Sequence, residues 1–209
     1  MVQETWQSLF DGETLDGWFA TGFPSEWDVE DGAIVCYGTN PIRELRADTY
    51  DGTTYLCTED RYEDFEFAFE YRIEPEGNSG IYFRWAELTD RQSGMEIQIL
   101  DPERYDEVGQ TTTGSLYDMA APTADPAEPY PAWNQFRLRC DGPNIEVWIN
   151  DEHVLAVDID EWDTPGENPD GTENKFTGYA MRDVPRNGRL ALQNHDEQCW
   201  FRDIKVREL

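Results

Sequence analysis

The sequence predicts an all-β fold of the sandwich or jelly-roll class, and three observations lead to it. Short segments in which apolar and polar residues alternate, the pattern of half-buried strands, recur along much of the chain. Turn-forming Gly, Pro, Asn and Asp residues separate these segments. No segment of helical length shows a convincing helical period. The 209 residues suit one domain over residues 1–209 with decorated loops, and 8 Trp, 10 Tyr and 10 Phe are ample for its core.

The strands are best defined in the middle and at the end of the chain. Over residues 65–73, phenylalanine, tyrosine and isoleucine alternate with glutamate, alanine and arginine, which predicts a long amphipathic strand. Clusters of Pro, Gly, Asn and Asp at residues 74–78, 141–144 and 150–151 predict turns. The predicted strands, in order, cover residues 65–73, 81–85, 94–101, 136–140, 145–149, 153–157, 190–195 and 199–206.

Two segments are too long and too polar to be strands. Residues 102–132 and 160–188 are rich in Pro, Gly, Thr and Asp. Loops of this length in a compact domain are usually functional lids or rim loops. Residues 160–174 are almost equally well interpreted as an acidic, solvated insertion.

The charge of the chain limits its partners and its solvent. The formal net charge is −29, from 45 acidic and 16 basic residues, and the only lysines are Lys175 and Lys205. A charge of this size repels nucleic acid and anionic membranes, so neither is an expected partner. The acidic residues are dispersed rather than gathered in a tail, and the regular aromatic strands argue against disorder. We therefore expect a halophilic protein whose self-repulsion is screened by molar salt.

The N-terminal residues and the cysteines indicate a reducing compartment. The start, Met-Val-Gln-Glu-Thr-Trp-Gln, has neither a basic n-region nor an apolar h-region, and no apolar run is long enough to span a membrane. We therefore expect a cytoplasmic protein. The widely spaced Cys36, Cys57, Cys140 and Cys199 form no zinc pattern, so buried free thiols are expected.

The most informative strand covers residues 94–101, Gly-Met-Glu-Ile-Gln-Ile-Leu-Asp. Because side chains alternate along a strand, Ile97 and Ile99 would enter the core while Glu96 and Gln98 share the other face. A carboxylate beside an amide on a rigid strand is a common way to build a sugar-handling cleft. The alternative is a strand whose polar face meets water.

Histidine is scarce, and this excludes several classes of site. The chain holds only His153 and His195, so most histidine triads and multi-histidine metal sites are excluded. No phosphate-cradling glycine loop and no Gly-x-Ser-x-Gly elbow occurs. His153 follows a turn and is interpreted as structural or solvent-facing. His195, by contrast, ends an apolar strand in a polar cluster with Gln193, Asn194 and Asp196, and this cluster is a candidate site.

Other candidates flank these strands. Arg84 would lie on the polar face of the strand after Gly77-Asn78-Ser79-Gly80, with Trp85 pointing the opposite way into the core. Its alternative is a solvated arginine paired with a carboxylate. Tyr117, Tyr130 and Trp133, in or beside the first long loop, are candidates for stacking on a sugar ring.

Several segments, in a fixed order, resemble one family. Each is weak alone, but together they span nearly the whole chain. They are Leu9–Trp18, Trp27–Gly32, Tyr62–Glu66, Gly77–Arg84, Glu96–Asp101, Thr113–Tyr117, Trp133-Asn134, Val147–Asn150, Leu192–His195 and Trp200–Val206. This series is similar to the 3-keto-disaccharide hydrolase domain family.

The resemblance implies a concanavalin A-like β-sandwich that acts on 3-keto-glycosides, sugars oxidised at C3. It also implies, for some members, a divalent cation. Two features depart from the family pattern. Members commonly carry secretion signals, whereas this start has none, and the family's Leu-Gln-Asp-His is Leu-Gln-Asn-His here, which removes a possible carboxylate contact.

A mechanism consistent with the resemblance removes the C2 proton, which the neighbouring ketone acidifies, and expels the C1 group. Glu96 and His195 are the acid–base candidates. If a cation acts instead, the same two residues would hold it. The remaining substrate-binding candidates are Asn78, Arg84, Gln98, Tyr117, Gln193 and Asn194.

Two alternatives belong to other classes of function. A classical retaining glucanase needs two carboxylates about 5–5.5 Å apart, but Gln98 stands where the second would be expected and Asp101 would point to the opposite face. A non-catalytic carbohydrate-binding module is compatible with the same fold, because fold alone does not determine function.

Overall fold

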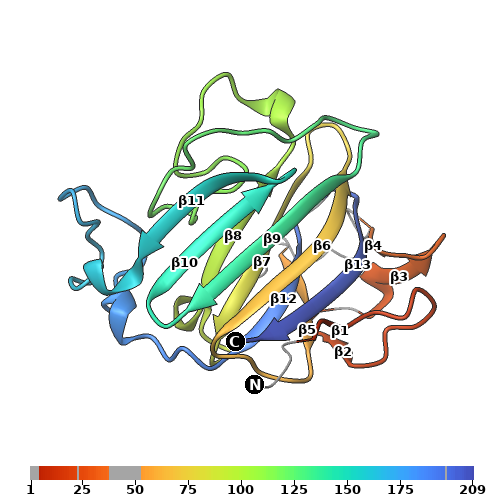
Figure 1. The fold of residues 1–209 in the computed structure, drawn as a ribbon, viewed down its shortest axis with the longest axis horizontal. Helices are drawn as coiled ribbons and strands as arrows, with labels where there is room; N and C mark the ends of the chain where they lie inside the picture. The colour runs from red at the N-terminus through yellow and green to blue at the C-terminus, as the bar shows by residue number, and fades with distance from the viewer. Residues whose placement is uncertain (1–4, 23, 38–52, 196) are drawn as a thin grey trace, which may run out of the picture.

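A computed structural model describes residues 5–22, 24–37, 53–195 and 197–209. Two antiparallel sheets pack face to face, with the larger sheet in front in Figure 1. The strands are β1 (Gln7–Ser8), β2 (Trp18–Ala20), β3 (Trp27–Glu30), β4 (Ala33–Cys36), β5 (Thr54–Thr58), β6 (Phe65–Ile73), β7 (Asn78–Trp85), β8 (Met95–Leu100), β9 (Asn134–Asp141), β10 (Asn144–Ile149), β11 (Glu152–Asp158), β12 (Arg189–Asn194) and β13 (Cys199–Glu208).

The strand order confirms the predicted all-β sandwich. The larger sheet runs β11-β10-β9-β6-β13-β4-β3, and β1 pairs with β13. The smaller sheet runs β2-β5-β12-β7-β8. Each sheet contains strands from both halves of the chain, and the main hydrophobic core lies between the two sheets.

The core lies between the sheets because the inward positions of both are apolar. On β6, Phe65, Phe67 and Phe69 are buried, while the intervening residues include Glu66 and Ala68 on the outer face. Rings stack across strands, as with Phe69 and Phe136, whose centroids are 4.7 Å apart. The alternation seen in the sequence therefore gives the correct face for these strands.

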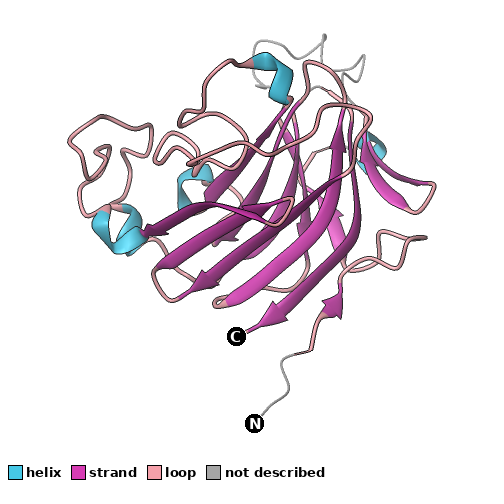
Figure 2. Ribbon diagram, turned by 45° about the horizontal axis from the view of Figure 1, so that its top comes forward, coloured by secondary structure: helices cyan, strands magenta, loops and turns pink. Residues whose placement is uncertain are grey.

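Helical structure in the described residues is limited to short 3-10 turns, seen in Figure 2. Within those same residues, no helix has the length and apolar character needed to cross a bilayer. The turns are η1 (Pro24–Glu26), η2 (Arg91–Ser93), η3 (Pro102–Arg104), η4 (Ile159–Glu161) and η5 (Met181–Asp183).

All four cysteines are free and buried, as the sequence predicts. Burial raises the pKa of the Cys36 and Cys140 thiols to about 12, so they stay protonated and behave as small apolar side chains.

The two long loops cover the smaller sheet. The first follows the free edge of β8: Gln98 N–H donates to the Ser115 carbonyl at 3.1 Å, and Tyr117 N–H donates to the Glu96 carbonyl at 2.9 Å. The second is joined to the β7–β8 connection, where Gly178 N–H donates to Gln92 Oε1 at 2.7 Å. An exposed edge strand is thereby covered, and side chains of both loops are brought over the outer face of the sheet.

Candidate active site

A cavity of about 150 Å³ lies on the outer face of the smaller sheet, beneath the two long loops. Strands β5, β7, β8 and β12 form its base, and each long loop contributes one side chain. This placement agrees with the expectation that the loops are rim loops. The lining residues are Thr53, Tyr55, Asn78, Tyr82, Arg91, Glu96, Gln98, Tyr117, Lys175, Gln193 and His195.

Glu96 is at the base of the cavity. Its inward neighbours Ile97 and Met95 belong to the core, so strand alternation turns its carboxylate outward. The side chain is only 4% exposed, and Gln193 Nε2 donates to its Oε1 at 2.8 Å. The carboxylate lies over β7 at Gly80, where a Cβ atom would come within 2.5 Å of Oε1.

The electrostatic state of Glu96 follows from its burial. Desolvation raises the pKa of the carboxyl group above its ordinary value of 4.5. The Lys175 ammonium opposes this rise most strongly, followed by hydrogen bonds from Gln193 and Tyr82 and by Arg91. A buried carboxylate with a raised pKa, held by a donor, is the arrangement that general bases commonly have.

Lys175 is the cationic counterpart of Glu96 in the cavity. Its Nζ lies 3.7 Å from the centroid of the Tyr117 ring. Burial lowers the pKa of the ammonium, while the negative charges of Glu96 and Asp118 raise it. Asp118 also fixes the lysine backbone, since Lys175 N–H donates to its Oδ2 at 2.7 Å. The contacts of Lys175 with Tyr117 and Asp118 therefore join the two long loops over the cavity.

Neutral polar groups complete the base of the cavity. Gln98 Nε2 donates to Asn78 Oδ1 at 3.0 Å, which fixes the orientation of both amides. Gln193 Oε1 is buried and has no hydrogen-bond partner among the described residues. An acceptor of this kind is unusual in a protein interior and suits a ligand hydroxyl. Burial raises the pKa of Tyr55 to about 12, so its hydroxyl remains a donor at neutral pH.

Most residues predicted from the sequence meet in this cavity. Lining it are Glu96 and His195, the two acid–base candidates, and four of the predicted substrate-binding residues: Asn78, Gln98, Tyr117 and Gln193. They come from β7, β8, the first loop, β12 and the residue after β12, so the sheet brings together segments far apart in the chain. Asp196, the last residue of the predicted polar cluster, lies outside the described residues.

The expected placement of Arg84 is corrected by the structure. Arg84 is fully buried; its Nε and Nη2 donate to the Glu63 carbonyl at 3.0 and 2.8 Å, and Nη2 lies 3.1 Å from Asp64 Oδ1. The reason is a β-bulge: Arg84 has φ +50°, and the β12–β7 register shifts between Arg189 and Ala191. The Arg84 side chain therefore binds the two residues just before β6 and does not line the cavity.

The same bulge places Trp85 differently from the expectation. Trp85 is buried, as predicted, but in a satellite cluster with Tyr55 and Tyr82 rather than in the main core. Its indole N–H donates to the Asp90 carbonyl at 2.9 Å. From the bulge onward, the side chains at the end of β7 therefore point to the face opposite to the one that simple alternation predicts.

Three further candidates lie elsewhere. Asn194 is buried next to Gln193 but is not among the lining residues; its amide donates to the Tyr37 carbonyl at 3.3 Å. Tyr130 and Trp133 flank the Arg72 guanidinium, whose carbon lies 5.8 and 5.0 Å from their ring centroids. Their roles in this cavity, expected from sequence, are thus not supported by their positions.

Five lining residues were not predicted. Tyr55 and Thr53 come from a strand region with no alternation, and Arg91 and Lys175 come from connections without a motif. Tyr82 could have been predicted, because the alternation in the sequence puts it on the polar face of its strand. It pairs in register with Glu96 and faces the same side. For Lys175, the only signal in the sequence was that the chain contains just two lysines.

The described residues do not form a complete metal site. Glu96 and His195 are the predicted ligands, but no group of three or more His, Cys, Asp or Glu side chains in the described ranges could hold a metal ion. Two cationic side chains, Arg91 and Lys175, also line the cavity. We therefore derive no catalytic step through a cation.

Comparison with known proteins identifies the family of the chain. A family model described as the 3-keto-alpha-glucoside-1,2-lyase-like domain matches residues 5–207. The chain belongs to this family. The chain is also 26% identical over 240 aligned positions to the 3-keto-disaccharide hydrolase of Bacteroides thetaiotaomicron, covering 97% of this chain and 78% of that protein.

Solved structures are similar to this chain as well. A crystal structure from Parabacteroides distasonis, provisionally described as a glycosyl hydrolase, superposes with a TM-score of 0.82 at 26% identity, covering 98% of this chain and all of that one. A Bacillus subtilis protein of unknown function with a galectin-like fold gives a TM-score of 0.60 at 12% identity, covering 100% and 98%. The second likeness shows the jelly-roll fold alone.

Proposed function

We propose that this chain cleaves 3-keto-glycosides by removal of the C2 proton and elimination at C1, followed by hydration. The observation that carries the proposal is that one buried carboxylate, Glu96, and one ammonium, Lys175, line the same small cavity, where the ammonium lowers the pKa of the carboxyl group. Family membership and the similarity to a protein named 3-keto-disaccharide hydrolase support a carbohydrate-active role.

Glu96 is the base in this proposal. Removal of the C2 proton sends the electron pair into the C3 carbonyl and generates an enolate. Loss of the C1 oxygen substituent then gives a 2-hydroxy-3-keto-glucal, and water adds to C1 while C2 is reprotonated. The base must first be ionised, and the positive charge of Lys175 favours that form.

The remaining groups have complementary roles. In this proposal the Lys175 ammonium stabilises the enolate oxygen, because a fixed cation in a desolvated site is most effective where negative charge develops. His195 is the candidate acid for the departing oxygen. Asn78, Gln98 and the unpaired Gln193 oxygen are suited to binding sugar hydroxyls.

The size of the cavity favours a single sugar ring. Its volume of about 150 Å³ is below the range of about 300–1,000 Å³ found for pockets that hold drug-sized ligands. We propose that the oxidised ring occupies this space and that the C1 substituent extends outward.

The glucanase alternative lacks its second carboxylate. Glu96 is the only carboxylate among the described lining residues, whereas retaining glycosidases use two. Asp101 is the candidate for the second carboxylate that lies nearest to Glu96 in the sequence. It accepts hydrogen bonds from the backbone N–H groups of Glu76 and Glu103 and so stabilises the turns at these residues.

The test is incubation with α- and β-linked 3-keto-glucosides in molar salt, beside their unoxidised parents. We expect cleavage of a 3-keto-glucoside only, and its loss in Glu96→Gln with the fold retained. Absence of turnover on every substrate would overturn the enzymatic proposal, and saccharide binding without turnover would favour a binding module. Parallel reactions after EDTA treatment, with Ca²⁺ or Mn²⁺ restored, test the cation that the family resemblance implies.

A further inference from the structure

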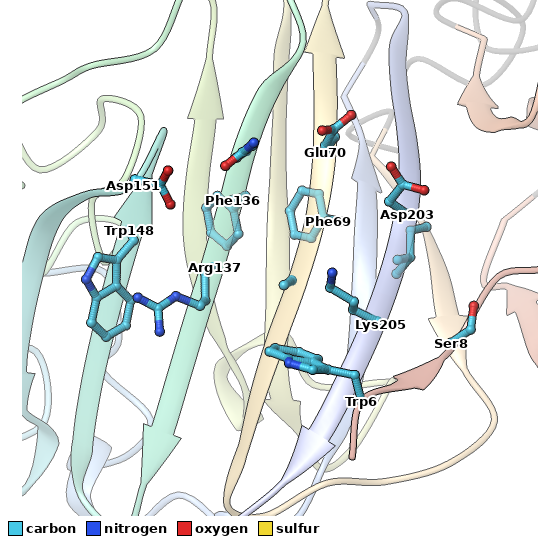
Figure 3. A pocket seen from close by; sticks show the side chains of 13 residues that line it. Trp6, Ser8, Phe69, Glu70, Phe136, Arg137, Trp148, Asp151, Asp203 and Lys205 are labelled. Carbon is cyan, nitrogen blue, oxygen red and sulfur yellow. The ribbon is translucent and has the colours of Figure 1, made fainter. Parts of the chain in front are cut away.

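The outer face of the larger sheet carries a second hollow, a groove of about 550 Å³ (Figure 3). It lies on the other side of the sandwich from the Glu96 cavity, because that cavity is on the outer face of the smaller sheet. One row of paired residues crosses its floor, with Ala68 in the middle. The row runs Trp148, Arg137, Ala68, Lys205, Ser8 from β10 to β1.

The small side chain of Ala68 leaves the groove open between two walls. Trp148 and Arg137 stand on one side, with the guanidinium carbon 3.7 Å from the Trp148 ring centroid. Trp6 and Lys205 stand on the other, with Nζ 5.4 Å from the Trp6 centroid. Trp6 lines the groove and is 36% exposed, although the Arg207 guanidinium carbon also lies 5.0 Å from its ring centroid.

Three carboxylates lie toward one end of the groove, away from Trp6 (Figure 3). Glu70 is paired with Arg202 at 2.6 Å. Asp203 and Asp151 have φ +52° and +64°, backbone conformations that favour glycine. At Asp203 the cause is a β-bulge in β13, which turns a carboxylate toward the groove.

We propose that this groove is a non-catalytic binding site for an uncharged oligosaccharide of two or three sugar rings. Aromatic faces cover the apolar C–H face of a sugar, and carboxylate, amide and guanidinium groups bind its hydroxyls in both directions. Carboxylates outnumber cations among the residues lining the groove, with Glu70, Asp151 and Asp203 against Arg137 and Lys205, so we expect a neutral sugar to be preferred over an acidic one. The proposal does not depend on the reaction proposed for the Glu96 cavity.

Lys205 supports a recognition role for this face. The chain has only two lysines, and each lines one of the two hollows over an aromatic ring. Despite the net charge of −29, the described residues place no carboxylate within ion-pair distance of Lys205. Its ammonium is therefore a donor available to a ligand in the groove.

The test is calorimetric titration of the full chain in molar KCl with unoxidised maltotriose, cellotriose and laminaritriose, and with trigalacturonate as the acidic probe. We expect at least one neutral trisaccharide to bind and trigalacturonate not to bind. Trp6→Ala and Asp203→Gly should each weaken binding by about tenfold or more, the loss expected for one good aromatic or polar contact. Glycine suits φ +52°, so the Asp203→Gly variant removes the carboxylate without straining the strand.

Glu96→Gln should bind the same sugar unchanged, and Trp6→Ala should cleave 3-keto-glucosides at the rate of the parent chain. The proposal is overturned if no neutral trisaccharide binds. It is equally overturned if binding responds to Glu96→Gln but not to Trp6→Ala, which would place the sugar in the other cavity. A fall in molar mass by light scattering in Trp6→Ala would instead assign this face to self-association.

Discussion

The Glu96 carboxylate lies against the backbone of Gly80 on the neighbouring strand, and a methyl group at Gly80 would come within 2.5 Å of its Oε1. The two residues come from β8 and β7, and Gly80 pairs in register with Gln98. Glycine at this position therefore leaves the space in which the candidate base is held by Gln193. The conformation of the candidate base therefore depends on the absence of a Cβ atom at residue 80.

Gly80→Ala should displace the carboxylate and break its hydrogen bond to Gln193. Because misplacing a catalytic group by about 1 Å can cost about 10²-fold, we expect a fall in kcat/KM on a 3-keto-glucoside of that order. The overlap involves the end of a flexible side chain, so the Tm should change little. Gly109→Ala is the control, since nothing lies within 4 Å of the added methyl group. Equal activity in both variants would show that the position of Glu96 is unimportant.

Lys175→Met should move the acid limb of the kcat/KM–pH profile to higher pH. Burial already raises the Glu96 pKa above 4.5, and the Lys175 ammonium is the largest influence that lowers it. Without that charge the pKa rises further, so the ionised base appears only at higher pH. Lys205→Met removes the same charge far from the cavity and should leave the profile in place. An acid limb that stays unmoved in Lys175→Met would contradict the proposed coupling.

Arg84→Met should lower stability and leave KM unchanged. The fully buried guanidinium binds the Glu63 carbonyl and Asp64, and methionine makes none of these hydrogen bonds. We expect a loss of about 2–3 kcal/mol in the free energy of unfolding, discounted because the Asp64 side chain is 40% exposed. Arg182→Met, which removes an exposed pair with Asp163, should cost about 1 kcal/mol or less. A large rise in KM in Arg84→Met with unchanged stability would restore the substrate-binding role.

Salt should stabilise the chain strongly. The charge of −29 makes the folded state repel itself, and raising KCl from about 0.1 M to about 1 M shortens the Debye length from about 10 Å to about 3 Å. We expect the Tm to rise over this range, measured by circular dichroism, and to rise much less in a sugar solution of equal osmolality. A Tm independent of KCl would contradict a halophilic protein.

The strand pattern could be predicted from sequence wherever one face is polar. Alternation placed Glu96 and Gln98 on the outer face of β8 and its isoleucines in the core, as found. It could not identify β5, because Thr54–Thr58 is buried on both faces and shows no alternation. Arg84 was misplaced for a related reason, since a bulge reverses the faces that follow it.

The candidate site was predictable on the strands and not in the loops. Gln193 and His195 follow an apolar run, which marks them in the sequence. Lys175 lies in a long loop without a pattern, and its position over Tyr117 depends on tertiary contacts such as the hydrogen bond to Asp118. Loop residues reach a site through these contacts, which a periodic pattern does not encode.

The most direct test of the central claim is deuterium incorporation at C2 when a 3-keto-glucoside is cleaved in ²H₂O. If Glu96 removes the C2 proton and elimination precedes hydration, the released sugar should carry deuterium at C2, detected by mass spectrometry and NMR. Glu96→Gln and enzyme-free samples at the same pH correct for spontaneous exchange beside the ketone. Cleavage that leaves hydrogen at C2 at the level of these controls would contradict the account and indicate direct hydrolysis at C1.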